Sequence, residues 1–200
     1  KDLGERISNI VMMGIGEPLD NFDNAMRFLE LVGDGKGLNL SLRNISLSTC
    51  GVVPRIYDLM ERHLQLTLSV SLHAPNNEMR SKTMPINKKY PIEELLKACR
   101  EYTKRTSRRI SFEYAMIKDV NDSDACAYEL AALLKGMLCH VNLIPANEIV
   151  ESSHKRSTNE RLESFIKILN SRGINATVRR SLGSDIDASC GQLRSRHNRE

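Results

Sequence analysis

The sequence has 200 residues, of which 40% are hydrophobic and 27% charged, with a net charge of +4. This composition is typical of a globular protein and excludes a disordered chain, and the length predicts one domain over residues 1–200. No apolar run approaches the roughly 20 residues that cross a bilayer, and the charged N-terminus lacks the apolar region of a secretory signal. We therefore expect a cytoplasmic protein without a membrane partner.

The two ends of the chain carry further information. The sequence starts without Met and soon enters an apolar stretch, so we expect a fragment whose true start lies upstream. Residues 151–200 hold ten of the 29 Lys and Arg residues but six of the 25 Asp and Glu residues, so the whole positive surplus lies there. Such a surplus is either a solvated surface or a contact zone for nucleic-acid phosphates.

Short β-rich runs alternate with helical runs along the chain. The predicted strands are Ser8–Met13, Asn44–Thr49, Leu66–Leu72, Ile110–Ile117, Val141–Ile144 and Ala176–Arg180. Apolar residues at helical spacing predict helices around Ala25–Val32, Ile56–His63, Ile92–Cys99 and Leu162–Leu169. Pro54 and Pro91 mark helix starts, and Gly173 marks a helix end.

This β-α-β-α repetition predicts an α/β fold with a parallel sheet and right-handed crossovers. Six strands are too few for a complete eight-stranded barrel, which needs about 250 residues. Two architectures remain open at this point, a partial barrel and an open doubly wound sheet.

Polar residues and glycines follow the predicted strands, where parallel α/β folds bind ligands. Gly14 and Gly16 allow close approach of the backbone, and the Glu17 carboxylate accepts from an amine. Ser48, Ser71, His73 and Asn147 offer further hydrogen-bonding groups. These strand ends together predict a polar small-molecule site. Cys190, a thiol in a loop with basic residues nearby, is a candidate nucleophile.

Several familiar motifs are excluded. Leu19 occupies the last glycine position of a G-x-G-x-x-G loop, so the dinucleotide interpretation fails. The segment Asp119–Asp124 begins like an EF-hand, but Asp124 replaces the required glycine. The cysteines Cys50, Cys99, Cys126, Cys139 and Cys190 lack zinc-type spacing, and no metal ligands are predicted. Their odd number, without a secretory signal, indicates a reducing compartment, and Cys99 and Cys126 are predicted core residues.

The strand ends resemble those of the radical S-adenosylmethionine (SAM) family, and within it the RNA adenine C2-methyltransferases of the RlmN type. The segments that carry the resemblance run from about Asn9 to about Leu193. They are Gly14–Asn21, Leu47–Pro54, Ser71–Asn76, Met84–Tyr90, Val141–Pro145 and Gly183–Leu193.

The resemblance implies a partial (β/α)6 TIM-like barrel of the radical SAM type, missing its first strand and including the loop of Cys190. It implies SAM as cofactor, held through its amino-acid end by Gly16 and Glu17. The implied contacts to the rest of SAM come from Ser48, Ser71, Leu72, His73 and Asn147.

The implied reaction uses Cys190 as a methyl carrier. Cys190 takes a methyl group from one SAM, and a second SAM on a [4Fe-4S] cluster is cleaved to a 5′-deoxyadenosyl radical. The radical takes hydrogen from the methylated cysteine, and the new carbon radical adds to C2 of an adenine. The implied partners are 23S rRNA, tRNA and an electron donor such as flavodoxin, and a flipped-out target base suits such an enzyme.

The chain departs from the family in two respects. The C-x-x-x-C-x-x-C loop that ligates the cluster is absent, and so is an upstream cysteine that resolves the covalent adduct through a disulfide. We therefore expect this 200-residue piece to be inactive. The alternatives are a Cfr-type C8-methyltransferase, a non-catalytic RNA- or nucleotide-binding remnant, and a radical enzyme acting on another class such as peptides.

Overall fold

Six parallel strands form one sheet in the order β1-β2-β3-β4-β5-β6 in the computed structural model, which describes residues 7–14, 16–146 and 155–179. The strands are β1 (Ile10–Met12), β2 (Ile45–Thr49), β3 (Thr67–Ser71), β4 (Ile110–Met116), β5 (Cys139–Pro145) and β6 (Ala176–Val178). The α-helices are α1 (Phe22–Gly33), α2 (Val53–Glu61), α3 (Asn77–Thr83), α4 (Ile92–Thr106), α5 (Asp124–Leu134) and α6 (Asn159–Ser171). Two 3-10 turns, η1 (Leu42–Asn44) and η2 (Pro85–Lys88), complete the described elements.

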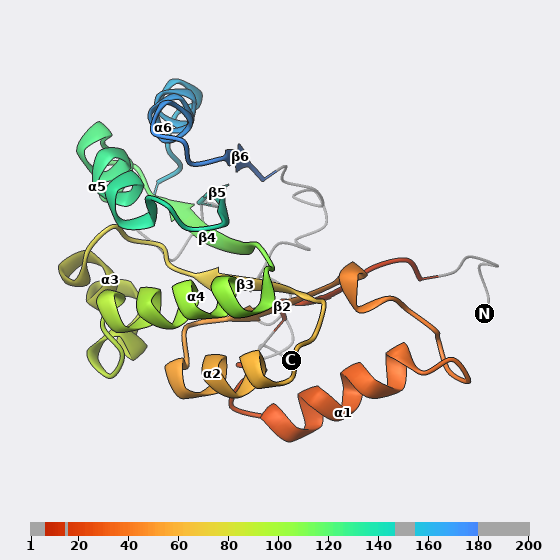
Figure 1. Ribbon diagram of the computed structural model, residues 1–200. Coiled ribbons are helices and arrows are strands. Elements are labelled where there is room, and N and C mark those ends of the chain that lie inside the picture. The colour runs from red at the N-terminus through yellow and green to blue at the C-terminus, as the bar shows by residue number, and fades with distance from the viewer. Residues whose placement is uncertain (1–6, 15, 147–154, 180–200) are drawn as a thin grey trace, which may run out of the picture.

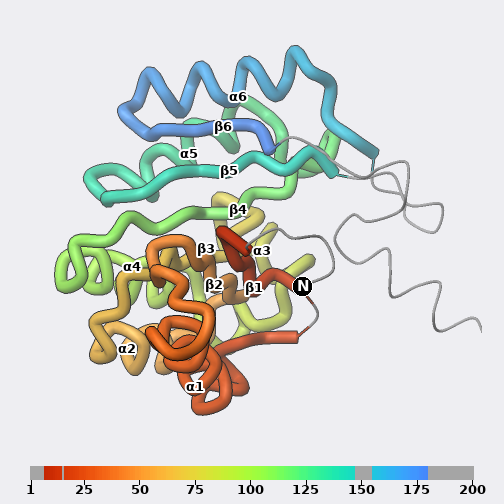
Figure 2. The backbone as a smooth tube through the Cα atoms, turned by 90° about the vertical axis from the view of Figure 1, so that its right-hand side faces the viewer, coloured from red at the N-terminus to blue at the C-terminus, as the bar shows by residue number. Residues whose placement is uncertain are grey.

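Each strand pairs with the next one along the chain, and at least one helix connects every such pair. Right-handed crossovers that always advance in one direction place their helices on the same face of the sheet. Figure 2 shows the strands following one another from β6 to β1, with α6 and α1 at the two ends of the row. Helix α2 packs on α4, and α5 packs on α6 (Figure 1).

The core lies between the helices and alternate side chains of the strands. Leu47, Val70, Phe112 and Leu143 are fully buried in the four central strands, β2 to β5. The helices contribute apolar side chains at helical spacing, and the ring of Phe165 in α6 lies 5.3 Å, between centroids, from that of Tyr114 in β4. Burial of these side chains supplies the main favourable free energy of folding.

The intervening side chains face the other side of the sheet, and most of them are polar. One row across neighbouring strands is Ser48, Ser69, Ser111 and His140. The next row is Ser71, Glu113, Asn142 and Thr177. Parallel sheets are normally covered by apolar contacts on both faces. A polar second face is therefore the face on which the fold leaves room for a ligand.

The predicted α/β class and all six predicted strands are confirmed, and each predicted strand end lies within two residues of the observed one. The sequential strand order decides between the two architectures left open, because a doubly wound sheet carries helices on both faces. An open partial barrel is what the structure shows. Helix α3 was not predicted, no range was predicted for α5, and α2 ends at Glu61, before His63. None of the helices in the described ranges combines the length and hydropathy needed to span a membrane.

Candidate functional site

The carboxyl ends of the strands bring the predicted ligand-binding residues to one edge of the sheet, which we call the rim. The rim consists of Gly14 and Gly16–Pro18 after β1, Cys50–Gly51 after β2 and Leu72–Ala74 after β3. The register places these turns side by side, since β1 pairs with β2 and β2 with β3 in parallel.

Gly16 and Glu17 occupy the turn after β1. Gly16 has φ +97°, a conformation that favours glycine, and a Cβ built on it would meet nothing within 4 Å. The Glu17 carboxylate accepts from the backbone N–H of Leu19 (3.0 Å) and, through its other oxygen, from that of Cys50 (2.7 Å). Glu17 therefore ties the turn after β1 to the turn after β2. This role was not predicted. The Cys50 thiol also hydrogen-bonds to this carboxylate, so about one of its roughly four lone pairs stays available to a ligand.

An adjoining hollow of about 590 Å³ runs along β1 and α1. Gly14, Gly16 and Glu17 line its polar end, while Val11 and Phe28 line its apolar part and are 65% and 39% exposed. The turn after β1 thus borders a space large enough for a small organic molecule.

Ser48 and Ser71 lie on the polar face, in β2 and β3, and both are half-buried. Within the described residues, neither hydroxyl has a hydrogen-bond partner. A half-buried hydroxyl without a protein partner is well suited to bind a ligand, because it already lacks part of its hydration.

Leu72 and His73, which follow β3, make different contacts. The ring Nδ1 of His73 accepts from the backbone N–H of Ala115 (3.0 Å), so its proton lies on Nε2 when the ring is neutral. Burial, and then the charge of Arg80, lower the pKa of His73 to about 4, which keeps the ring neutral at pH 7. Leu72 is fully buried, and its N–H and C=O bind Glu113 and Arg80. Leu72 therefore supports the rim from beneath.

Glu113 forms the centre of the polar face. It is 5% exposed and accepts from Asn142 Nδ2 (2.8 Å) and from the Ser111 hydroxyl (3.2 Å). Burial raises the pKa of Glu113, while these two hydrogen bonds and the charge of Arg179 oppose the rise. Glu113 therefore places a buried carboxyl group, held by two neutral donors, on the face that the helices leave uncovered.

Arg80, Glu113 and Asn121 are site residues that sequence reasoning missed. Asn121 lies in the EF-hand-like segment, and its side chain donates to the carbonyls of His73 (2.8 Å) and Ala115 (2.7 Å). Its place in the loop that follows β4 was an available signal. Arg80 and Glu113 had none, because their burial depends on residues distant in sequence.

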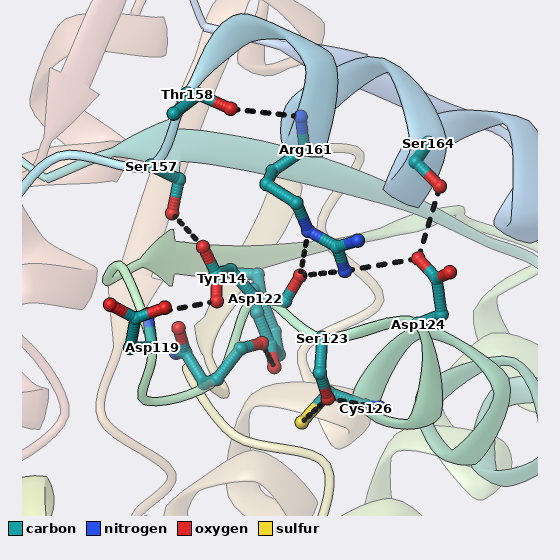
Figure 3. Close-up of polar contacts among 11 residues, drawn as sticks. Tyr114, Asp119, Asp122, Ser123, Asp124, Cys126, Ser157, Thr158, Arg161 and Ser164 are labelled. Carbon is teal, nitrogen blue, oxygen red and sulfur yellow. Dashed lines mark hydrogen bonds and ion pairs between the residues drawn. The ribbon is translucent and has the colours of Figure 1, made fainter.

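The EF-hand-like segment borders a second hollow of about 720 Å³. Asp122 accepts from the N–H of Asp119 (3.0 Å) and the hydroxyl of Ser157 (2.9 Å). Arg161 donates to the Asp122 carbonyl (2.6 Å) and to the carboxylate of Asp124 (3.0 Å) (Figure 3). These contacts join the starts of α5 and α6, so the acidic residues of the segment serve to hold the two helices together.

Asn147 and Cys190, two predicted site residues, lie outside the described residues. The other four cysteines are free, and Cys99 and Cys126 are buried as predicted. Burial, followed by the neighbouring Glu17 carboxylate, raises the pKa of Cys50 to about 12, and burial raises that of Cys99 to about 12 and that of Cys139 to about 11. These three thiols are protonated at neutral pH and are poor nucleophiles.

Comparison with known proteins agrees with this geometry. Residues 1–131 match the family described as the Radical SAM superfamily. The chain is 56% identical over 197 residues to the "Probable dual-specificity RNA methyltransferase RlmN" of Clostridium tetani, covering 98% of this chain and 56% of that protein. The protein of the same name from Clostridium botulinum (strain Alaska E43) is 57% identical over 192 residues, covering 96% of this chain and 55% of that protein. The chain spans about half the length of these curated relatives.

Two solved structures extend the comparison. A radical SAM methyltransferase from Sphaerobacter thermophilus superposes with a TM-score of 0.92 at 50% identity, covering 96% of this chain and 56% of that one. A domain of pyruvate-formate lyase-activating enzyme from Bacteroides vulgatus shares the fold, with a TM-score of 0.67 at 17% identity, over 87% of this chain and 100% of that one. The chain belongs to the radical SAM superfamily, and its similarity to proteins of the RlmN type extends over nearly its whole length.

Proposed function

We propose that this chain forms the SAM-binding barrel of a cytoplasmic RNA methyltransferase, acting on C2 of an adenine in 23S rRNA and of an adenine in tRNA. The names of the relatives support the reaction class, and identity above one half supports the same substrates. A single observation on the chain itself carries the proposal. The carboxyl ends of β1, β2 and β3, with the turns that follow them, present an open glycine, two hydroxyls without a partner among the described residues and a neutral imidazole on the same edge.

The rim fits SAM, which carries an amino acid, a ribose and an adenine. Gly16 gives a ligand access to the backbone, and Glu17 has about one lone pair left for an ammonium group. Ser48 and Ser71 have hydroxyls for polar atoms, and the Nε2–H of His73 is a donor. Asn147 completes the proposed set from outside the described residues, and Leu72 holds the turn from below.

SAM would supply the transferred methyl group and, together with a [4Fe-4S] cluster and an electron donor such as flavodoxin, the radical. The described residues do not provide the cluster's ligands: within residues 7–14, 16–146 and 155–179, no three Cys, His, Asp or Glu side chains are grouped to hold a metal. The proposed role of this chain is therefore to bind and orient SAM and the RNA.

Cys190 is the proposed methyl carrier, in a C-terminal loop of the same domain. The protonated state of Cys50, Cys99 and Cys139 leaves these three thiols poorly suited to that role. The positive surplus of residues 151–200 surrounds Cys190 in sequence, and we propose that it contacts RNA phosphates.

The test uses the complete gene product that contains this sequence, expressed in a strain without its own adenine C2-methyltransferase. Mass spectrometry of nucleosides from 23S rRNA and tRNA should detect 2-methyladenosine in both. Cys190→Ala should abolish the modification and leave SAM cleavage intact. Cys126→Ala, at a buried cysteine of α5, is the matched control and should keep the modification.

Two outcomes contradict the proposal. Detection of 8-methyladenosine would assign the protein to the Cfr type. Binding of SAM without any modification of RNA by the wild-type protein would assign it to a non-catalytic binding role.

A further inference from the structure

Arg80 in α3 is fully buried, and its guanidinium joins two turns of the rim. Nη2 donates to the carbonyl oxygens of Cys50 (2.7 Å) and Ser71 (3.1 Å), and Nε donates to that of Leu72 (3.2 Å). Nη1 donates to the side chain of Asn87 (3.1 Å). One side chain therefore binds the carboxyl end of β2 and the carboxyl end of β3 together.

The charge of Arg80 has only neutral partners among the described residues. Burial lowers the pKa of Arg80, because the charged form loses its hydration. A buried cation without an anion is costly, and Arg80 offsets this cost through its hydrogen bonds to three backbone carbonyls. The guanidinium therefore fixes the positions of the carbonyls that it binds.

The arginine is itself held in place. Asn87, 3% exposed in η2, accepts from Arg80 and donates to the hydroxyl of Ser81 (2.8 Å) and to the side chain of Asn77 (3.1 Å). Because Arg80 is held by the rim carbonyls and by Asn87, its side chain has little conformational entropy left to lose when a ligand binds. Such support is how folds preorganise binding groups.

Gly51 shows independently that the turn after β2 is closely packed beside the guanidinium of Arg80. Its φ is +103°, and a Cβ built there would lie 3.1 Å from both Cδ atoms of Leu95 and 3.4 Å from Nη2 of Arg80. A side chain at this position would press against Leu95 and strain the turn that carries the Cys50 carbonyl bound by Arg80.

We propose that Arg80 is a positioning residue that sets the affinity of the rim for SAM. It acts through the carboxyl ends of β2 and β3, which carry Ser48 and Ser71, and through the turn with His73, and it does not touch the ligand. The inference rests on the proposed function, since SAM is the ligand. The planar guanidinium reaches three carbonyls from fixed directions, whereas the single ammonium of lysine cannot reproduce this fork.

The test measures calorimetric affinity for S-adenosylhomocysteine, which does not react, together with the melting temperature. It compares Arg80→Lys and Arg80→Met with the wild type, in the complete gene product. Loss of charge-assisted hydrogen bonds should weaken binding about tenfold or more, with lysine retaining more affinity than methionine. Leu169→Ala in α6, fully buried and away from the rim, is the control for destabilisation and should lower the melting temperature without changing the affinity.

Two results would overturn the role of Arg80: wild-type affinity in both Arg80 variants, or an equal loss of affinity in Leu169→Ala at the same loss of melting temperature. If Arg80→Met does not fold, Gly51→Ala tests the same contact from the side of the turn, and unchanged affinity there would also overturn the role. Absence of binding by the wild-type protein would instead refute the proposed function, and the role of Arg80 with it.

Discussion

Removing the Glu17 carboxylate should loosen the connection between the turns after β1 and β2. Glu17→Ala deletes two hydrogen bonds from backbone N–H groups to a charged acceptor, at 3.0 Å from Leu19 and 2.7 Å from Cys50. A hydrogen bond to a charged group contributes about 1.5–3 kcal/mol. Glu17 is half-buried, so the lower figure applies to each bond, and the free energy of unfolding should fall by about 3 kcal/mol.

Glu17→Gln should fall between the wild type and the alanine variant. Its amide oxygen can accept one of the two N–H groups, but its NH2 group would face the other donor, so about 1.5 kcal/mol should be lost. Urea denaturation at pH 7 measures both variants. Asp20→Asn, at an exposed carboxylate three residues after Glu17, is the control and should change the free energy by less than about 0.5 kcal/mol.

The reasoning about Glu17 fails if Glu17→Ala unfolds at the same urea concentration as the wild type. A loss of SAM affinity with unchanged stability would show that the carboxylate serves the ligand alone. Equal losses in the glutamine and asparagine variants would indicate a general effect of charge in this turn.

Three further predictions concern side chains near the rim. The pKa of His73 falls from 6.5 to about 4 on folding, so the unfolded chain binds a proton more readily than the folded chain, and the free energy of unfolding should drop by at most about 3 kcal/mol as pH falls from 6.5 to 4. Urea titrations of His73→Gln should lack this part of the pH dependence, and the same pH dependence in the wild type and the variant would contradict it. The Cys50 thiol, with its pKa near 12, should react with iodoacetamide at pH 8 roughly a thousandfold more slowly than free cysteine, and peptide mapping that finds rapid labelling would refute the assignment. Tyr114→Phe removes the hydroxyl that donates to the buried Asn121 carbonyl (2.8 Å) and should cost about 1–3 kcal/mol in thermal unfolding, an expectation that an unchanged melting temperature would exclude.

The strands were predictable because each contains a run of apolar and β-branched residues bounded by turn residues. The location of the rim was predictable once the strands were, because ligand sites of parallel sheets lie at the carboxyl ends of the strands. Gly16 and Ser71 follow from this rule, and the structure brings them to the same edge.

Other features depend on contacts that no local pattern contains. Helix α3 has seven residues, mostly polar, and its Arg80 is buried by turns from two separate strands. Phe28 follows the helical apolar spacing of α1 but is 39% exposed, because it borders the hollow along β1. Glu17 was predicted to bind an amine, and its contacts to two backbone N–H groups required the fold to be seen.

The turn after β3 is anchored almost entirely through atoms that every amino acid possesses. The carbonyls of Ser71 and Leu72 bind Arg80, and the N–H groups of Leu72 and His73 bind the carbonyl of Glu113. The Ser71 hydroxyl takes no part in this anchoring. Residue 71 can therefore change identity while the backbone keeps its course, so that a new ligand preference could evolve by single substitutions without a prior loss of the scaffold.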